Sequence, residues 1–147
     1  MSDQYTYKVI PYDEKLINTY NDLVFNSDLP EELKFYVASA ESRFGYPTLF
    51  CLCENDGNIV GGVSFIEVSD NGTPYVEISS IFISEPHRRK KLGAGIVESI
   101  EKHAKSKQIE HLKVTTDNQF IGAKEFYQKC GFKLLPDANF LSMEKTI

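Results

Sequence analysis

The sequence predicts an α+β fold with three α/β/α layers, in which helices cover both faces of a central mixed, mostly antiparallel sheet. Apolar residues recur with strand and helix periods in the order strand, two helices, three antiparallel strands, helix, strand, helix and two strands. An Asp-Gly pair between two apolar runs predicts a β-hairpin. The 147 residues are expected to form a single domain, 1–147, which is long enough to bury a hydrophobic core.

The N-terminal part is predicted to contain one strand and two helices. Alternating side chains in residues 5–10, followed by proline, predict the first strand. Asp13 is a suitable N-cap for the first helix, which the Asn-Ser-Asp sequence of residues 26–28 ends. Pro30 has a position typical of the first turn of a helix, and this second helix is predicted to stop near residues 45–47.

Two antiparallel strands are predicted next, over residues 48–53 and 59–68. The turn between them contains Asp56-Gly57, in which glycine supplies the positive φ that a tight hairpin needs. The Gly61-Gly62 pair inside the second strand indicates a bulge or the close approach of another backbone.

The functional prediction depends on residues 75–107. A strand over residues 76–83 is stopped by Glu85-Pro86, and a basic turn over residues 88–91 then leads into a helix. That helix has an apolar face at four-residue spacing, formed by Leu92, Ile96, Ile100 and Ala104. The unpaired amides of a first helical turn, together with basic side chains, predict an anion-binding site. The alternative is a solvated basic turn whose small residues serve only packing.

The C-terminal part is predicted to form a strand over residues 109–116, a helix over residues 120–129, and closing strands over residues 132–135 and 140–145. Gly131 follows the helix at the usual position of a glycine C-cap.

The charge distribution argues against nucleic acid as a partner. The net charge is −5 although residues 88–91 are all basic, so no basic surface is expected outside this turn. The acidic remainder suits a cationic amine, or serves only solubility. No apolar run is long enough to span a bilayer, and the N-terminus lacks the apolar core of a signal peptide. We therefore expect a cytoplasmic protein without a membrane partner.

The three cysteines predict no disulfide framework, because their number is odd. Cys51 and Cys53 would project to the same face of one strand, a spacing that could ligate a metal. A second pair of ligands is missing from the sequence pattern, so we expect buried structural thiols and no metal cofactor.

The basic turn and its flanks resemble motif A of the GNAT superfamily of N-acetyltransferases, whose loop reads Arg/Gln-x-x-Gly-x-Gly/Ala between a strand and a long helix. The matching segment is IFISEPHRRKKLG, residues 81–93. Arg88 takes the first position and Gly93 the last, whereas Lys91 replaces the middle glycine. A second register, with Lys90 first, keeps both glycines but aligns the apolar helix residues less well. We expect Lys91 to donate its amide with a negative φ.

The closing segment resembles the same superfamily. AKEFYQKCGF, residues 123–132, is similar to the motif Ala-x-x-x-Tyr-x-x-x-Gly-Phe. The resemblance covers nearly the whole chain, most strongly over residues 76–132. It implies a GNAT-type fold whose sheet is splayed at the cofactor site, acetyl-CoA as cosubstrate, and a small-molecule or peptide amine as acceptor. It also implies a homodimer as one option for the assembly.

The resemblance further implies which residues contact the cofactor. Backbone amides of the strand through Ile81 hold the pantetheine arm, and the amide of Ile81 faces the thioester oxygen. Phe120 stands where the family often has an asparagine, so Asn118 is the nearest substitute. The implied cofactor-binding residues are Ile81, Phe82, Ile83, Arg88, Arg89, Lys90, Lys91, Leu92, Gly93, Ala94, Asn118 and Tyr127.

Two side chains are candidates for catalysis. Tyr127 matches the family tyrosine that protonates the departing thiolate; the alternative is a packing role beside Phe126. Glu77 resembles the base of histone-modifying members and precedes Ile81 by four residues, where alternate side chains of a strand share a face. The alternative is an exposed glutamate, or one paired with a lysine.

These features predict an acetyl-CoA-dependent N-acetyltransferase that acts by direct attack of a primary amine within a ternary complex. The alternative is a non-catalytic module that binds acyl-CoA as a sensor. In the family, the first two helices shape the acceptor pocket, which corresponds to about residues 16–47. That segment is aromatic and acidic, which suits a polyamine, an aminoglycoside, a lysine side chain or a protein N-terminus.

Overall fold

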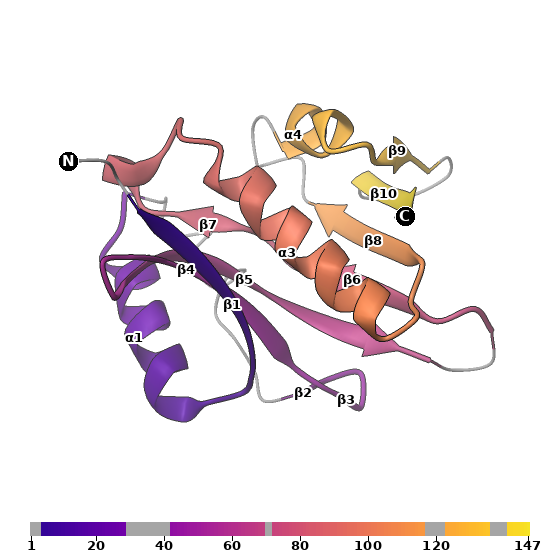
Figure 1. The fold of residues 1–147 in the computed structure, drawn as a ribbon, viewed down its shortest axis with the longest axis horizontal. Coiled ribbons are helices and arrows are strands. Elements are labelled where there is room, and N and C mark those ends of the chain that lie inside the picture. Colours follow the sequence, from indigo (N-terminus) through magenta and orange to yellow (C-terminus); the bar gives the residue numbers. More distant parts are fainter. Residues whose placement is uncertain (1–3, 29–41, 70–71, 117–122, 136–140) are drawn as a thin grey trace.

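The computed structural model describes residues 4–28, 42–69, 72–116, 123–135 and 141–147. Over these residues the elements follow the predicted order, with a small hairpin added and one predicted strand divided in two (Figure 1). Their bounds are β1 (Tyr5–Pro11), α1 (Glu14–Phe25), β2 (Ser42–Arg43), β3 (Tyr46–Pro47), β4 (Leu49–Asn55), β5 (Asn58–Val68), β6 (Tyr75–Ile78), β7 (Phe82–Ile83), the 3-10 turn η1 (Glu85–His87), α3 (Leu92–Ser106), β8 (His111–Thr116), α4 (Ala123–Lys129), β9 (Lys133–Leu134) and β10 (Leu141–Thr146).

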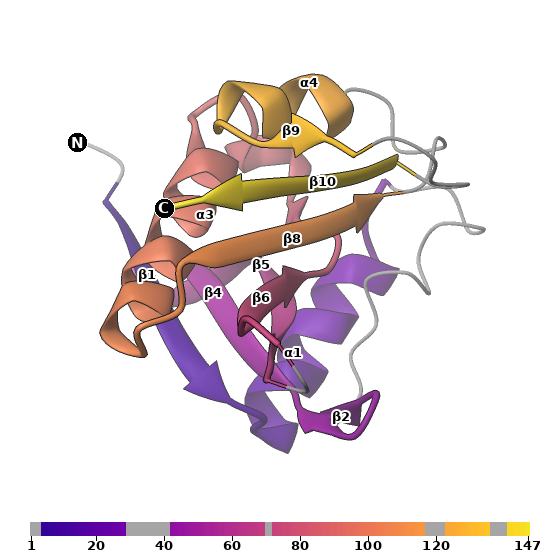
Figure 2. The ribbon, with the colours of Figure 1, turned by 90° about the vertical axis from the view of Figure 1, so that its right-hand side faces the viewer.

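Within the described residues, eight strands form one sheet in the order β1-β4-β5-β6-β8-β10-β9, and β7 pairs with β5 beyond the end of β6. Neighbouring strands are antiparallel except β6 and β8, which are parallel because α3 connects them. Figure 2 shows β6, β8 and β10 side by side along this sheet. The predicted α+β fold with a mixed, mostly antiparallel sheet is therefore confirmed.

Two apolar clusters lie on opposite faces of the sheet. On one face, which we call the α3 face, α3 crosses the sheet over β1 and β4, and the cluster continues to β10 and α4; its buried side chains include Cys51, Phe65, Val76, Ile78, Ile96, Ile100, Leu112, Tyr127 and Met143. On the other, the α1 face, the cluster consists of Ile17, Tyr20, Val24, Phe50, Leu52 and Phe82. Each fully buried aliphatic side chain stabilises the fold by about 1.5–3 kcal/mol.

The N-terminal predictions are confirmed in part. Asp13 caps α1, since its carboxylate accepts a hydrogen bond from the amide of Leu16 at 3.1 Å. The helix predicted from Pro30 lies mostly outside the described residues. The prediction that it reaches residues 45–47 is wrong, because β2 and β3 pair there as a hairpin. Phe44 and Gly45, with φ of 53° and 83°, form its two-residue turn.

The β4–β5 hairpin and its glycines are confirmed. Asp56 and Gly57 have φ of 51° and 85°, which matches the turn that joins strands with two residues. A Cβ on Gly61 would lie 2.6 Å from the carbonyl oxygen of Phe82, so the pair does mark a close backbone approach. Gly62 in turn accepts a hydrogen bond from the buried hydroxyl of Tyr20 at 3.0 Å, which fixes α1 to the sheet.

The C-terminal elements agree with the prediction where the structure describes them. Gly131 has a φ of 97° and ends α4 as a C-cap. Lys145 on β10 donates to the carbonyl of Cys130 at 2.6 Å and to the carboxylate of Glu101 at 2.8 Å, so one side chain joins β10, α3 and the end of α4. Of the helices in the described ranges, none combines the length and apolar character required to cross a bilayer.

Candidate active site

The predicted strand over residues 76–83 is interrupted by a β-bulge. Phe65 of β5 pairs with Ile78, whereas Gly62 pairs with Phe82. Residues 79–81 therefore lie opposite only two residues of β5, so the strand carries one extra residue at this point.

The bulge changes which face the following side chains occupy. Val76 and Ile78 pack on the α3 face, and beyond the bulge Ile81 and Ile83 pack there as well. Without the extra residue, Ile81 would have pointed to the α1 face, because side chains alternate along a strand. The sequence did carry the signal, since Ile78 and Ile81 are three positions apart, whereas strict alternation on one face requires an even number.

The sheet opens at the same place. β6 and β8 pair as far as Ile78 and Val114, after which β8 continues beside β10 while β7 follows β5 (Figure 1). We call this separation the β7–β8 divergence. It confirms the splayed sheet predicted for this fold.

Some backbone amides at the bulge have no acceptor in the sheet. The amide of Ser79 donates to Ser64 at 2.9 Å and that of Ser84 to Val60 at 2.9 Å. In the described parts of the chain, no backbone acceptor is found for the amides of Ser80 and Ile81. The segment therefore offers hydrogen-bond donors to a molecule that lies in the divergence.

The amides of the next two residues, Phe82 and Ile83, point in opposite directions. The amide of Ser84 donates to Val60, so these two residues form a hydrogen-bonded pair of the antiparallel ladder. Such pairs alternate with pairs that are not hydrogen-bonded. Phe82 therefore exchanges hydrogen bonds with Gly62, and the amide of Ile83 is directed away from β5. Of the three strand residues predicted to offer amides, Ile81 and Ile83 have them directed away from β5, and the sheet uses that of Phe82.

The basic turn after η1 exposes the start of α3. Arg89 and Lys91 both have left-handed φ, of 64° and 62°, and the first amide to bond along the helix is that of Gly95, to Lys91 at 3.2 Å. The amides of Leu92, Gly93 and Ala94 thus belong to the first turn, which has no intrahelical acceptors. The expectation that Lys91 keeps a negative φ is wrong, because the chain must reverse there to enter the helix.

The basic side chains of this turn differ in their contacts and exposure. The guanidinium of Arg88 donates to both carboxylate oxygens of Asp28 and to the carbonyl of Ile83, each at 2.8 Å. Hydrogen bonding from Arg88 lowers the pKa of Asp28, so the ion pair between the two side chains persists at neutral pH. Arg88 therefore joins the turn to the end of α1, whereas Arg89 and Lys91 have exposed side chains.

The start of α3 packs closely on α4. A Cβ on Gly93 would lie 3.0 Å from the ring of Phe126. Tyr127 is 3% exposed and lies between Phe126 and Phe132, with ring centroids 5.0 Å and 5.4 Å away. Burial raises the pKa of Tyr127, so its hydroxyl is protonated at neutral pH. The packing predicted as the alternative is confirmed, and the acid role stays a prediction.

Glu77 is half-buried on β6 and lies on the α1 face, because it alternates with Val76 and Ile78. The expectation that Glu77 shares a face with Ile81 is wrong, since the bulge lies between them. Lys113 of β8 is in register with Glu77, but its ammonium lies over the ring of Tyr75, 4.1 Å from the centroid. Asn118 lies outside the described residues.

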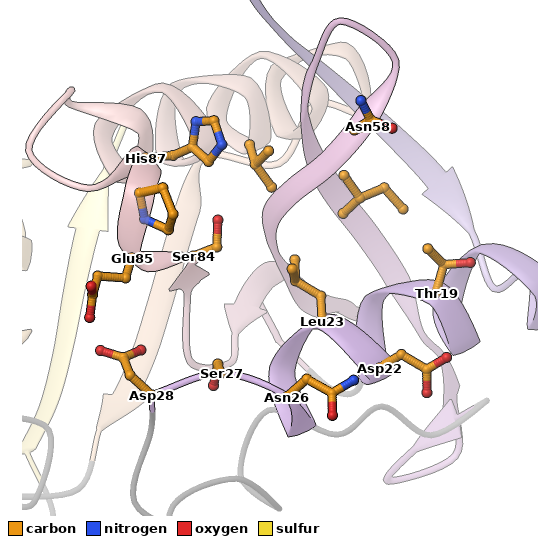
Figure 3. Close-up of a pocket in the computed structure, with 13 residues that line it drawn as sticks. Thr19, Asp22, Leu23, Asn26, Ser27, Asp28, Asn58, Ser84, Glu85 and His87 are labelled. Atoms are coloured by element: carbon orange, nitrogen blue, oxygen red, sulfur yellow. The ribbon is translucent and has the colours of Figure 1, made fainter.

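A separate hollow of about 730 Å³ lies between the end of α1, the start of β5 and η1 (Figure 3). Asp22, Asp28 and Glu85 line it, and Figure 3 shows Asp28 and Glu85 on the same side. Its lining includes no residue of β6, β8 or α4, so the hollow is distinct from the β7–β8 divergence.

Cys51 and Cys53 are buried thiols, whereas Cys130 is half-buried. Desolvation raises the pKa of Cys51 to about 12 and that of Cys53 to about 11, so both stay protonated at neutral pH. In the part of the chain that the structure describes, no three histidine, cysteine, aspartate or glutamate side chains gather as metal ligands.

Comparison with known sequences gives two matches. A model of the acetyltransferase (GNAT) family matches residues 14–132. The streptothricin acetyltransferase of Escherichia coli is 31% identical over 72 residues. That match spans 49% of this chain and 41% of the relative, so the chain corresponds to less than half of that protein.

Comparison with solved structures supports the fold. The PaiA N-acetyltransferase from Thermoplasma acidophilum, in complex with coenzyme A, has a TM-score of 0.75 at 18% identity, covering 97% of this chain and 99% of that chain. The YhbS GNAT family N-acetyltransferase from Escherichia coli, in complex with CoA, has a TM-score of 0.73 at 15% identity, covering 99% of this chain and 83% of that chain.

The left-handed φ of Lys91 leads to a stability prediction. Lys91→Gly is expected to raise the free energy of unfolding by about 1 kcal/mol, because glycine has no Cβ to crowd the backbone at this φ. Chemical denaturation measures the difference. The control Ala94→Gly, in the first turn of α3, should lower the free energy of unfolding by about 0.5–1 kcal/mol. Equal destabilisation by both changes would contradict the prediction.

Proposed function

Since the chain belongs to the acetyltransferase (GNAT) family, we propose that it transfers the acetyl group of acetyl-CoA to a primary amine by direct attack within a ternary complex. The observation that carries the proposal is the set of backbone amides, at the bulge and at the start of α3, for which the described residues supply no backbone acceptor. The η1 turn lies between the two groups of donors, and both groups belong to one continuous segment of the chain. Two proteins of the same fold were crystallised with CoA.

The start of α3 suits the pyrophosphate of CoA. The amides of Leu92, Gly93 and Ala94 point out of a 15-residue helix at the positive end of its dipole. The exposed side chains of Arg89 and Lys91 add charge that attracts phosphate oxygens. In this proposal Arg88 acts indirectly, since its ion pair with Asp28 fixes the turn to α1.

The bulge suits the thioester. The amide of Ile81 would donate to the carbonyl oxygen, where negative charge develops as the amine attacks. One such donor typically lowers the barrier of an acyl transfer by about 3 kcal/mol. The β7–β8 divergence lets the pantetheine arm lie beside β7, where the amide of Ile83 is also directed away from β5.

The chemistry needs one acid and one base. The amine nitrogen forms a bond to the acetyl carbon, the carbon–sulfur bond breaks, and the thiolate takes the proton of the Tyr127 hydroxyl. Glu77 accepts the proton lost by the amine, through a water molecule. Tyr127 belongs to the α3 face and Glu77 to the α1 face, so the proposal has the acceptor approach the divergence from the α1 face.

Release of free thiol from acetyl-CoA tests this function. We expect thiol release with at least one amine of a panel that includes polyamines, amino acids, lysine peptides and streptothricin, which the curated relative acetylates by its name. Product mass should rise by one acetyl group. Tight binding of CoA without thiol release from any amine would support the non-catalytic sensor instead.

Tyr127→Phe is expected to lower kcat by at least about tenfold while the Kd for acetyl-CoA changes little, because the thiolate loses its proton donor. Since burial raises the pKa of Tyr127 above its ordinary value, the wild-type acid should still be protonated at pH 10, where an exposed tyrosine is about half ionised. The control is Tyr20→Phe, which removes the buried hydrogen bond to Gly62 and should lower stability without affecting kcat. An unchanged kcat in Tyr127→Phe would remove this residue from the mechanism.

Glu77→Gln is expected to lower kcat/KM most at neutral pH, where the amine is protonated and needs a base. The loss should shrink as the pH approaches about 10, where amines of ordinary basicity lose their proton to the solvent and need no base. Full pH–rate profiles measure this effect. Glu144→Gln is the matched control, because Glu144 is an exposed glutamate of β10 in register with Lys113. A Glu77→Gln profile that overlays the wild type would end the assignment.

A further inference from the structure

The β2–β3 hairpin holds an arginine at the start of the bulge. Nη1 of Arg43 donates to the hydroxyl of Ser79. Ser79 in turn accepts a hydrogen bond from the hydroxyl of Ser64 at 3.0 Å. The guanidinium of Arg43 is thus held at Ser79, which directly precedes the two residues of the bulge whose amides have no backbone acceptor in the described chain.

This arginine lies on the same face as Glu77. Ser64 and Ser79 alternate with Phe65 and Ile78, which pack on the α3 face, so their hydroxyls are on the α1 face. Glu77 precedes Ser79 by two residues on that face. Two residues of a strand span about 7 Å. The carboxylate of Glu77 and the hydroxyl that the guanidinium of Arg43 contacts therefore come from strand positions about 7 Å apart, at the edge of the divergence.

The guanidinium keeps one edge for a ligand. Nη1 is used by Ser79, while Nε and Nη2 have no hydrogen-bond partner in the described ranges. Nor does any carboxylate there form an ion pair with Arg43. The Nε–Nη2 edge has the geometry that binds both oxygens of a carboxylate.

The aromatic residue in the turn after Arg43 contacts its guanidinium. Phe44 is 79% exposed and has a left-handed φ of 53°, a conformation that aromatic residues seldom adopt. Its ring lies 5.5 Å from the guanidinium carbon of Arg43. The ring covers one side of the cation and so holds the plane of the guanidinium.

A second polar group on the α1 face lacks a partner. Thr48 is 1% exposed, and its hydroxyl makes no hydrogen bond within the described chain. It alternates with Leu49, which packs in the α3 cluster, so the hydroxyl belongs to the α1 face. Buried hydroxyls are normally satisfied, and a ligand on this face would supply the missing partner.

We propose that Arg43 binds a carboxylate of the acceptor, and that the acceptor is a free amino acid whose amino group faces Glu77. This inference rests on the proposed function and names its substrate class. A zwitterionic amino acid carries one charge for each of these two groups, a carboxylate for Arg43 and an ammonium for Glu77. A polyamine would place a second cation against Arg43, which is unfavourable.

The test compares each amino acid with its own amide, which keeps the amine and removes the carboxylate charge. In thiol release by the wild type, we expect KM for the best amino acid to be at least about tenfold lower than for its amide. Arg43→Gln should remove this difference by raising KM for the acid, with kcat little changed, because glutamine can still donate to Ser79. Arg43→Lys, which keeps the charge but not the planar fork, should recover part of the difference.

Lys113→Gln is the matched control. Lys113 is another cation on the α1 face, and it lies over Tyr75 away from the bulge. Its replacement should leave the ratio of the two KM values unchanged. Equal use of acid and amide by the wild type, or equal loss of both in Arg43→Gln, would overturn the inference.

Calorimetric titration of the CoA-loaded protein with the twenty amino acids separates this inference from the proposed function. Binding that Arg43→Gln abolishes supports the carboxylate site even if no amine releases thiol, in which case the acetyl transfer fails. Thiol release only with amines that lack a carboxylate refutes the carboxylate site and upholds the transfer. Absence of binding by any amino acid at millimolar concentration also refutes the site.

Discussion

One extra residue in the strand beside β5 determines most of the site. The ladder that joins β5 to β6 cannot continue into β7 in the same register, because residues 79–81 lie opposite only two residues of β5. The excess leaves amides without sheet partners, and it reverses the alternation of side chains. At the same place β8 stays with β10 while β7 stays with β5. The donors, the opening and the change of face thus have one backbone cause.

The anion-binding turn depends on contacts made by distant parts of the chain. Arg88 is held by Asp28 at the end of α1, and Gly93 is packed against Phe126 of α4. With both ends fixed, the turn can reverse through Arg89 and Lys91 at left-handed φ and present the first amides of α3. A lysine is tolerated where a glycine would be less strained, because the surrounding contacts over-determine the backbone.

In the proposed reaction, the acid Tyr127 lies on the α3 face of the sheet and the base Glu77 on the α1 face. The α3 face is apolar and closely packed, so it buries Tyr127 and keeps its hydroxyl neutral. The α1 face near the bulge carries polar groups instead, with Glu77, Ser79 and Arg43 within a short stretch. A leaving thiolate needs a neutral acid in a dry site, whereas an arriving amine needs charged groups that water can reach. The opening between β7 and β8 is where these two environments meet.

The sequence by itself determined the order of the elements, the Asp56-Gly57 hairpin, the close approach at Gly61-Gly62 and the cap at Gly131. These follow from local rules, namely side-chain period and the φ that a turn requires. Tertiary structure alone decided that Arg88 pairs with Asp28, that Lys91 takes a left-handed φ, and that Arg43 reaches Ser79. Such features depend on register and on partners far along the chain, which period and composition do not encode.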